Sequence, residues 1–200
     1  MQVRTDSLRR LGTIAAAVAL GALLVVMSAC GSEPEKRDVA DSSGLFHFKV
    51  PEEWQVLNEV GRITVYASDA LPAEDESIDE LSLLVLTSDS VVAAPVDEAL
   101  PAFLADWAAG RGWSEVSTGT PRAVTVGERA ATRVDVEAVG GNGQPFRGAY
   151  VWTRTSGYEV LVMAVTPPAE WDSYQDEISA VLEEWYWLRA EGSTEPSATP

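Results

Sequence analysis

Four predicted strands in the second half of the chain are separated by only two to four residues. They run over residues 122–126, 131–139, 144–155 and 158–165, and the turns between them carry Gly127–Glu128, Gly140–Gly143 and Ser156–Gly157. Connections this short join only antiparallel neighbours, because a parallel crossover needs about a dozen residues or more. The sequence therefore predicts an antiparallel meander, and this meander limits the fold more than any other feature does.

Three further strands are predicted ahead of the meander. Phe46, Phe48 and Val50 alternate with polar residues, which indicates a half-buried strand. A second strand follows Gly61, and residues 81–87 are almost continuously apolar, which is typical of a strand buried on both faces. Within the meander, Thr132, Val134, Val136 and Ala138 alternate with Arg133, Asp135 and Glu137. The polar set of that strand is expected to face water.

Two helices complete the predicted fold. The first begins at Asp97 as its N-cap and ends before Gly110 and Gly112, with Pro101 close enough to the start that its missing N–H costs no helical bond. The second begins near Pro168. Its apolar stripe is Trp171, Tyr174, Ile178, Val181, Leu182 and Trp185. Because each helix has one apolar stripe, the sequence predicts an α+β fold, an α/β/α sandwich with a mainly antiparallel sheet and two covering helices.

Residues 1–29 have the order of a secretory signal peptide. Arg4, Arg9 and Arg10 precede the apolar run Leu11–Met27, and small residues stand before Cys30. A membrane span is the alternative, but 17 residues at a rise of 1.5 Å cover only about 26 Å of a hydrocarbon core about 30 Å thick. The sequence therefore favours a cleaved signal, with general secretion preferred to the twin-arginine route.

Cys30 is the single cysteine of the chain, and it stands directly after this segment. The sequence Met27-Ser28-Ala29-Cys30 resembles the bacterial lipobox, in which the cysteine receives a diacylglyceryl group and becomes the new N-terminus. Two acyl chains anchor a protein stably without a transmembrane helix. Cys30 is thus the predicted lipidation site, and a plain signal peptide with a coincidental cysteine is the alternative.

The regions beside the predicted domain are poor in large apolar residues. Residues 30–43 are expected to form a disordered tether and residues 189–200 a disordered tail, on either side of a folded domain over residues 44–188. Cleavage of the signal would remove three arginines and one aspartate, which leaves 30 acidic and 11 basic side chains and a net charge of −19. So acidic a chain is not expected to bind nucleic acid, because phosphate binding needs a basic surface.

The opening FHFKVPEEW over Phe46–Trp54 precedes a buried strand, a helix, a meander and a final aromatic-rich helix. This order is similar to the PsbP-like α/β/α sandwich, in particular to the small Lpq-type lipoproteins of actinobacteria, and the likeness covers residues 44–188. The segment GERAATR over Gly127–Arg133 resembles the turn that these proteins place between meander strands. Members of the family are chiefly binding or assembly modules, so the resemblance implies a binding role and transfers no functional residue.

Three features of the sequence contain residue types that could carry chemistry. His47 shares the polar side of its strand with Lys49, where a solvated edge histidine is favoured over a member of a Ser–His–Asp triad. The acidic loop Glu74–Glu80 departs from the EF-hand pattern, so a solvated loop is favoured over a weak calcium site. The aromatic run Trp185–Trp187 is expected to close the core with at least one ring left exposed. No catalytic, cofactor or metal residue is predicted.

The sequence therefore predicts a lipid-anchored accessory or binding lipoprotein, not an enzyme, on the extracytoplasmic face of the cell membrane. Its partner is expected to be a protein or another component of the cell envelope. Two alternatives stay open at this point. One is an envelope hydrolase that uses paired carboxylates on a carbohydrate or ester, and the other is a carrier of an apolar ligand.

Overall fold

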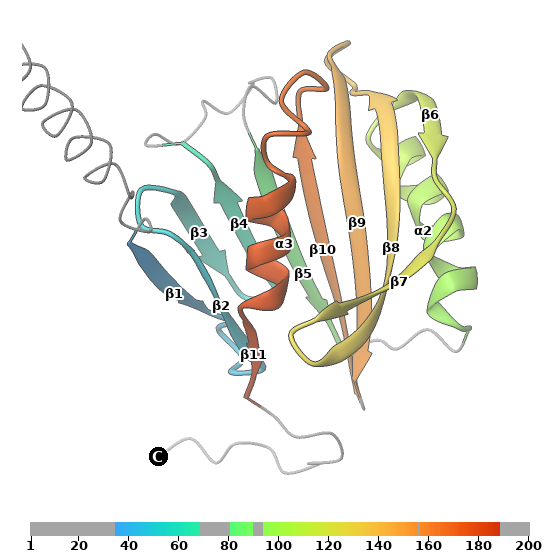
Figure 1. Ribbon diagram of the computed structural model, residues 1–200. Coiled ribbons are helices and arrows are strands. Elements are labelled where there is room, and N and C mark those ends of the chain that lie inside the picture. The colour runs from blue at the N-terminus through green and yellow to red at the C-terminus, as the bar shows by residue number, and fades with distance from the viewer. Residues whose placement is uncertain (1–34, 69–80, 90–93, 156, 189–200) are drawn as a thin grey trace, which may run out of the picture. The chain divides into compact units, whose positions relative to one another are not determined.

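A computed structural model describes residues 35–68, 81–89, 94–155 and 157–188 of the 200-residue chain (Figure 1). The strands are β1 (Lys36–Ala40), β2 (Phe46–Pro51), β3 (Gln55–Glu59), β4 (Arg62–Tyr66), β5 (Ser82–Ser88), β6 (Ser114–Thr118), β7 (Arg122–Val126), β8 (Arg129–Val139), β9 (Pro145–Thr155), β10 (Tyr158–Thr166) and β11 (Trp185–Trp187). The helices are α2 (Val96–Gly110) and α3 (Gln175–Glu183).

The larger of two sheets contains the predicted meander. Seven of its eight strands follow the order β3-β4-β5-β10-β9-β8-β6, and the eighth, β7, pairs with β8. Every pairing is antiparallel, and in the centre Val162 of β10 lies between Val85 of β5 and Val151 of β9. The prediction of a meander from β7 to β10 is confirmed. The strands β3 and β6 were not predicted.

A smaller sheet has the order β1-β2-β11. The tether predicted over residues 30–43 is wrong for its second part, because Lys36–Ala40 forms a strand that pairs with residues 47–51 of β2. Val39 is buried, and the Asp41 carboxylate accepts hydrogen bonds from the backbone N–H groups of Ser43 (3.1 Å) and Leu45 (3.3 Å). Pairing to a neighbouring strand thus orders a segment whose own apolar content is too low to reveal it. The predicted signal segment and the tail at 189–200 lie outside the described residues.

The first helix forms where it was predicted, with a different beginning. Pro95 occupies the N-cap position and no side chain caps the helix, so Asp97 is in the first turn. Pro101 consequently lies beyond the first turn, where its missing N–H removes one bond of the helical ladder. Leu100 and Leu104 are buried against the large sheet.

The second helix is shorter than predicted. It covers only Gln175–Glu183, and Trp185–Trp187 instead forms β11, which pairs with β2. The alternation of a strand turns the side chains of Trp185 and Trp187 inward, whereas Tyr186 is 47% exposed. The expectation that one of these aromatic rings remains exposed is confirmed, although the geometry that exposes it is that of a strand.

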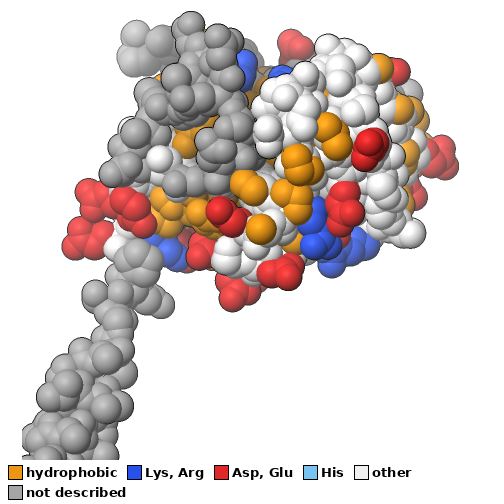
Figure 2. All heavy atoms as spheres, turned by 90° about the horizontal axis from the view of Figure 1, so that it is seen from above, with side chains coloured by type: hydrophobic (Ala, Val, Ile, Leu, Met, Phe, Trp, Pro, Cys, Tyr) orange, Lys and Arg blue, Asp and Glu red, His pale blue; other side chains and the backbone are white. Residues whose placement is uncertain are grey.

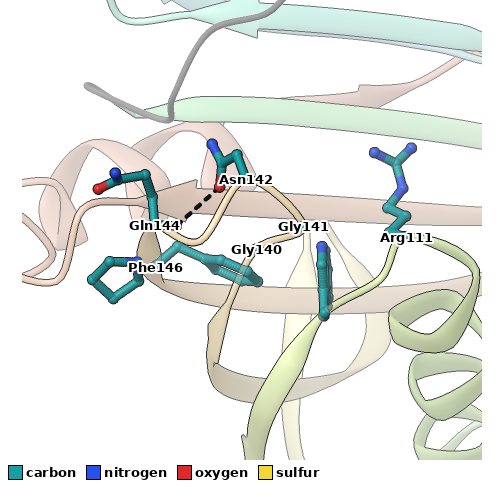
Figure 3. A pocket seen from close by; sticks show the side chains of 8 residues that line it. Arg111, Gly140, Gly141, Asn142, Gln144 and Phe146 are labelled. Atoms are coloured by element: carbon teal, nitrogen blue, oxygen red, sulfur yellow. Dashed lines mark hydrogen bonds between the residues drawn. The ribbon is translucent and has the colours of Figure 1, made fainter.

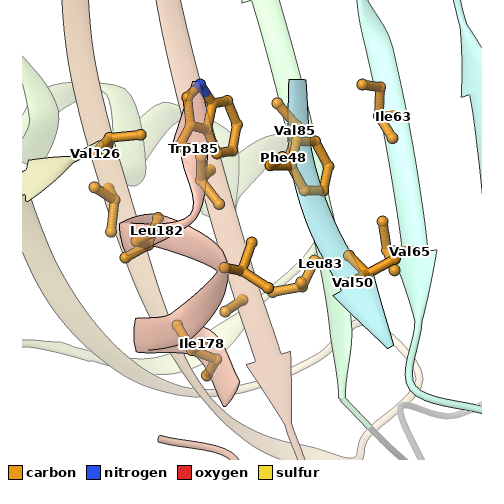
Figure 4. Packing of buried hydrophobic residues seen from close by; sticks show 14 of the residues in the cluster. Phe48, Val50, Ile63, Val65, Leu83, Val85, Val126, Ile178, Leu182 and Trp185 are labelled. Carbon is orange, nitrogen blue, oxygen red and sulfur yellow. The ribbon is translucent and has the colours of Figure 1, made fainter. Parts of the chain in front are cut away.

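The two faces of the large sheet carry separate apolar cores. Helix α2 covers one face, and α3 with the small sheet covers the other (Figure 1). On the second face the Trp185 ring centroid lies 4.5 Å from that of Phe46. It lies 4.7 Å from the centroid of Phe48, whose ring is beside it in Figure 4. These contacts hold β11 against β2 within the small sheet, and the same rings belong to the core cluster that the small sheet shares with β4 and β5 of the large one. The predicted α+β sandwich with two covering helices is confirmed.

Adjacent residues of β11 provide a test of this packing. We expect Trp185→Ala to lower the free energy of unfolding by about 3–5 kcal/mol, because a buried indole between Phe46 and Phe48 is removed. Tyr186→Ala is the matched control. It should lower the free energy of unfolding by less than about 1.5 kcal/mol, because it removes only the stacking of an exposed ring on His47. Urea unfolding followed by circular dichroism measures both. Equal losses would contradict the strand assignment.

Candidate functional site

The structure places the residues singled out from sequence in different parts of the molecule. Cys30 and the loop Glu74–Glu80 lie outside the described residues. His47 and the aromatic run Trp185–Trp187 meet in the small sheet, because β2 pairs with β11. None of these residues lines the pocket described below.

His47 lies on the outer side of the small sheet. Its Nδ1 atom is 3.2 Å from the Asp38 Oδ1 atom, and its ring stacks on Tyr186 with the centroids 4.9 Å apart. The predicted edge position is wrong, because β2 is the central strand of that sheet. Its contacts in the described part of the chain are a carboxylate and a phenol ring, which support a structural role.

The polar side of β8 is only partly in water. Arg133 was expected to be solvated, but its side chain is 8% exposed, and its guanidinium carbon lies 5.8 Å from the centroid of the Trp171 ring. Its Nε donates to the Asp135 carboxylate at 2.7 Å. Further along, Arg147 pairs with the exposed Glu137 at 2.8 Å. Both carboxylates of this face are therefore neutralised by arginines.

A pocket with a volume of about 320 Å³ opens where the end of α2 meets the hairpin between β8 and β9 (Figure 3). Its lining residues are Arg111, Trp113, Gly140, Gly141, Asn142, Gln144, Pro145 and Phe146. The volume lies at the lower end of the range of small-molecule sites, about 300–1,000 Å³. This pocket is the candidate functional site.

Close backbone contact between two loops holds the pocket together. A Cβ atom on Gly141 would lie 2.7 Å from the carbonyl oxygen of Arg111, so glycine is required for this approach. Within the hairpin, the backbone N–H of Gly140 donates to the carbonyl oxygen of Gln144 at 2.8 Å. The backbone N–H of Gln144 in turn donates to the Asn142 Oδ1 atom at 3.0 Å. The hairpin is thus internally fixed before any ligand binds.

Aromatic rings form the apolar part of the pocket. Phe146 is buried, and the Trp113 ring meets it edge to face at a centroid distance of 4.7 Å. Trp113 also contacts Tyr150, whose burial raises the pKa of its phenol above the ordinary value while the charge of Arg111 opposes that rise. The lining therefore rests on a packed aromatic group that extends into the core.

Polar groups surround this apolar surface. The side chains of Arg111, Asn142 and Gln144 project from the two loops toward the same side (Figure 3). The guanidinium of Arg111 lies 4.4 Å from the ring centroid of Trp107, which limits its movement. The lining includes one cation and two primary amides, and it includes no carboxylate.

The two turns that form this pocket are predicted by the sequence, but their contact is not. The residues indicate a hairpin at Gly140–Gly143 and a helix end at Gly110, yet the contact joins residues about thirty positions apart. The available sequence indication was the composition of the two turns. Arg111 and Trp113 flank one glycine, and amide side chains alternate with glycine in the other turn.

A metal centre and a membrane-spanning helix are two other features that would indicate a function. Across the described residues, no group of three or more His, Cys, Asp or Glu side chains is placed to hold a metal ion. Helices long and apolar enough to cross a membrane are likewise absent from the described ranges. Acidic side chains are spread over the face in Figure 2, and the basic ones gather in a few groups.

Solved structures share this fold. The Ran-binding protein Mog1p of Saccharomyces cerevisiae aligns with a TM-score of 0.56 at 14% identity, over 78% of this chain and 97% of its own. LpqN of Mycobacterium tuberculosis, a protein involved in cell envelope biogenesis, aligns with a TM-score of 0.54 at 16% identity, over 79% of this chain and 93% of its own. CyanoP, the PsbP of Synechocystis, aligns with a TM-score of 0.53 at 13% identity, over 80% of this chain and 97% of its own. The predicted PsbP-like fold is confirmed.

These likenesses define the architecture of the chain, and at such low identity they define nothing more. No family model matches the sequence, and no curated protein matches it. The residues of this chain are therefore the basis for its proposed function.

The contact between the two pocket loops can be tested by adding one methyl group. We expect Gly141→Ala to lower the free energy of unfolding by about 1–3 kcal/mol, because the new Cβ would displace the Arg111 carbonyl. Gly110→Ala is the control, because nothing lies within 4 Å of its added Cβ and alanine favours a helix. Chemical unfolding measures both, and a neutral Gly141→Ala would mean that the loops are not in contact.

The buried arginine gives a second prediction. Asp135→Asn should lower the free energy of unfolding by about 1–3 kcal/mol, because the buried guanidinium of Arg133 loses its charged acceptor. Glu137→Gln is the matched control on the same strand. Its ion pair with Arg147 is exposed and should be worth less than about 1 kcal/mol. Thermal and urea unfolding at pH 7 distinguish the two, and equal effects would show that Arg133 is solvated.

Proposed function

We propose that this protein is a lipid-anchored, extracytoplasmic binding or accessory protein of the cell envelope. The pocket of Arg111, Trp113 and the Gly140–Gln144 hairpin carries the proposal. Its lining combines aromatic surface with hydrogen-bonding groups, which is the composition of a recognition site. None of its eight lining residues is a nucleophile beside a general base, so the site is suited to holding a ligand rather than to transforming one.

Two observations support the location. Cys30 directly follows an apolar segment that has basic residues before it and small residues at its end. The fold is also that of LpqN, which is named for its involvement in cell envelope biogenesis. A chain of this fold on a lipid anchor would present its pocket outside the membrane.

The hydrolase alternative receives less support from the structure. A glycosidase needs one carboxylic acid with a raised pKa and one carboxylate, both free to act on a bound sugar. Asp135 and Glu137 share one side of β8, but each is paired with an arginine. The carrier alternative would need an internal cavity, whereas side chains pack both faces of the large sheet.

Metabolic labelling tests the anchor. We expect the full-length chain expressed in a bacterium to incorporate labelled palmitate, and Cys30→Ala to lose the label and leave the membrane fraction. Ser32→Ala, two residues away, is the matched control and should keep both properties. Undiminished labelling of Cys30→Ala would overturn the anchor, whatever the pocket binds.

A further inference from the structure

We propose that the pocket binds a sugar unit that carries a carboxylate, a hexuronate of an envelope glycan. This inference rests on the proposed binding function and names the ligand class for the same pocket. It is drawn from the three kinds of group that line the pocket: an aromatic surface, two amides and one guanidinium. Each of them matches a different part of such a sugar.

The aromatic surface matches the apolar side of a pyranose ring. One side of a hexose presents mainly C–H groups, and such a side is desolvated favourably against an aromatic ring. Trp113 is partly exposed, and its position is fixed by edge contacts with the buried rings of Phe146 and Tyr150. A rigid, half-exposed indole binds a ring at little cost in side-chain entropy.

The two amides match the hydroxyl groups of the sugar. Asn142 and Gln144 are exposed at the pocket, and each primary amide provides both a donor and an acceptor. The Asn142 Oδ1 atom already accepts from the Gln144 backbone, which fixes the side chain and leaves its NH₂ group to donate. A hydroxyl group can both accept and donate, so it can use either amide.

The charge of the pocket selects the carboxylate. The chain has 31 acidic and 14 basic side chains, yet the lining of this pocket has one arginine and no acid. The guanidinium of Arg111 is therefore the charged group of the lining that an anion in the pocket would meet, and screening at physiological salt weakens the effect of charges more than about 8 Å away. An arginine can hold a carboxylate by charge-assisted hydrogen bonds.

The size of the pocket limits the ligand to a single unit. About 320 Å³ is at the lower end for small-molecule sites, and the lining residues Arg111, Asn142 and Gln144 are exposed. An open site of this size suits one residue of a longer glycan, whose neighbours can continue into water. A glycan in the envelope is within reach of a protein at the membrane surface.

The test compares two sugars that differ at one carbon. The full-length chain in detergent would be titrated with methyl glucuronide and with methyl glucoside, while the indole N–H signals of ¹⁵N-labelled tryptophan are followed by NMR. We expect one indole signal, assigned to Trp113 by Trp113→Phe, to shift with the glucuronide. The glucuronide should bind about tenfold more tightly than the glucoside, the ratio for one charge-assisted contact of about 1.4 kcal/mol.

Variants separate the roles of the charge and of the amides. Arg111→Gln should abolish the tenfold preference, whereas Arg62→Gln, an exposed arginine on β4, should leave it unchanged. Asn142→Ala should lower the binding affinity for both sugars by a similar factor. An unchanged unfolding transition and unshifted signals in the free variants would show that these substitutions leave the fold intact.

Every outcome decides the proposal. Equal affinity for the two sugars, or a preference that Arg111→Gln leaves intact, would overturn the assignment of the carboxylate to Arg111. If neither sugar shifted the Trp113 signal, the proposal that the pocket binds a sugar would be overturned. If a different compound shifted that signal instead, the proposed binding function would stand while this inference fell. Palmitate labelling, which does not involve the pocket, tests the anchor separately.

Discussion

Both faces of the large sheet are apolar, and the need to cover them organises the whole domain. Along β10, Val160 and Val162 enter one core while the alternating residues Leu161 and Met163 enter the other. Each square ångström of apolar surface left in water would cost about 25 cal/mol. One cover is α2, and the other is assembled from α3 and the three-stranded sheet, whose aromatic side chains fill the space that one short helix could not.

The candidate site arises where the first of these covers ends. Helix α2 stops at Gly110, and the chain must return to the sheet as β6. The return places Arg111 and Trp113 beside the long β8–β9 hairpin, and Gly141 permits the backbones to touch. The pocket thus has walls from two loops and a base from the aromatic core. Such a site is rigid because its parts already serve the fold.

Much of this architecture could be predicted from periodicity, because apolar and polar residues alternate along a strand that has one buried face. The exceptions have a physical cause. In β6 every residue is exposed, and in β1 only Val39 is buried, so neither strand carries a pattern, and pairing with neighbours alone defines them. The spacing of Trp171, Ile178 and Trp185 fits a helical stripe, yet Trp185 belongs to a strand because β2 offers an open edge.

The candidate site was less accessible to such reasoning. Local sequence predicts that Gly140–Gly143 turns and that the helix ends near Gly110, but not that the two turns touch. Burial is equally a product of the tertiary structure. Arg133 has the position of a solvated residue in its strand, yet its side chain is buried and lies near the ring of Trp171, which is distant in sequence. A polar position in an alternating pattern therefore indicates which side of the sheet a residue faces, not whether water reaches it.

The pairing of β11 with β2 also has a consequence for the order in which the protein can fold. Trp187 pairs with Phe46, so the small sheet joins the beginning of the domain to its end. Contacts between residues so far apart in sequence form slowly, because a long loop must close first. A chain emerging from a ribosome or a secretion channel can assemble its meander early, but the aromatic side chains of β2 stay without their final cover until almost the last residues have appeared.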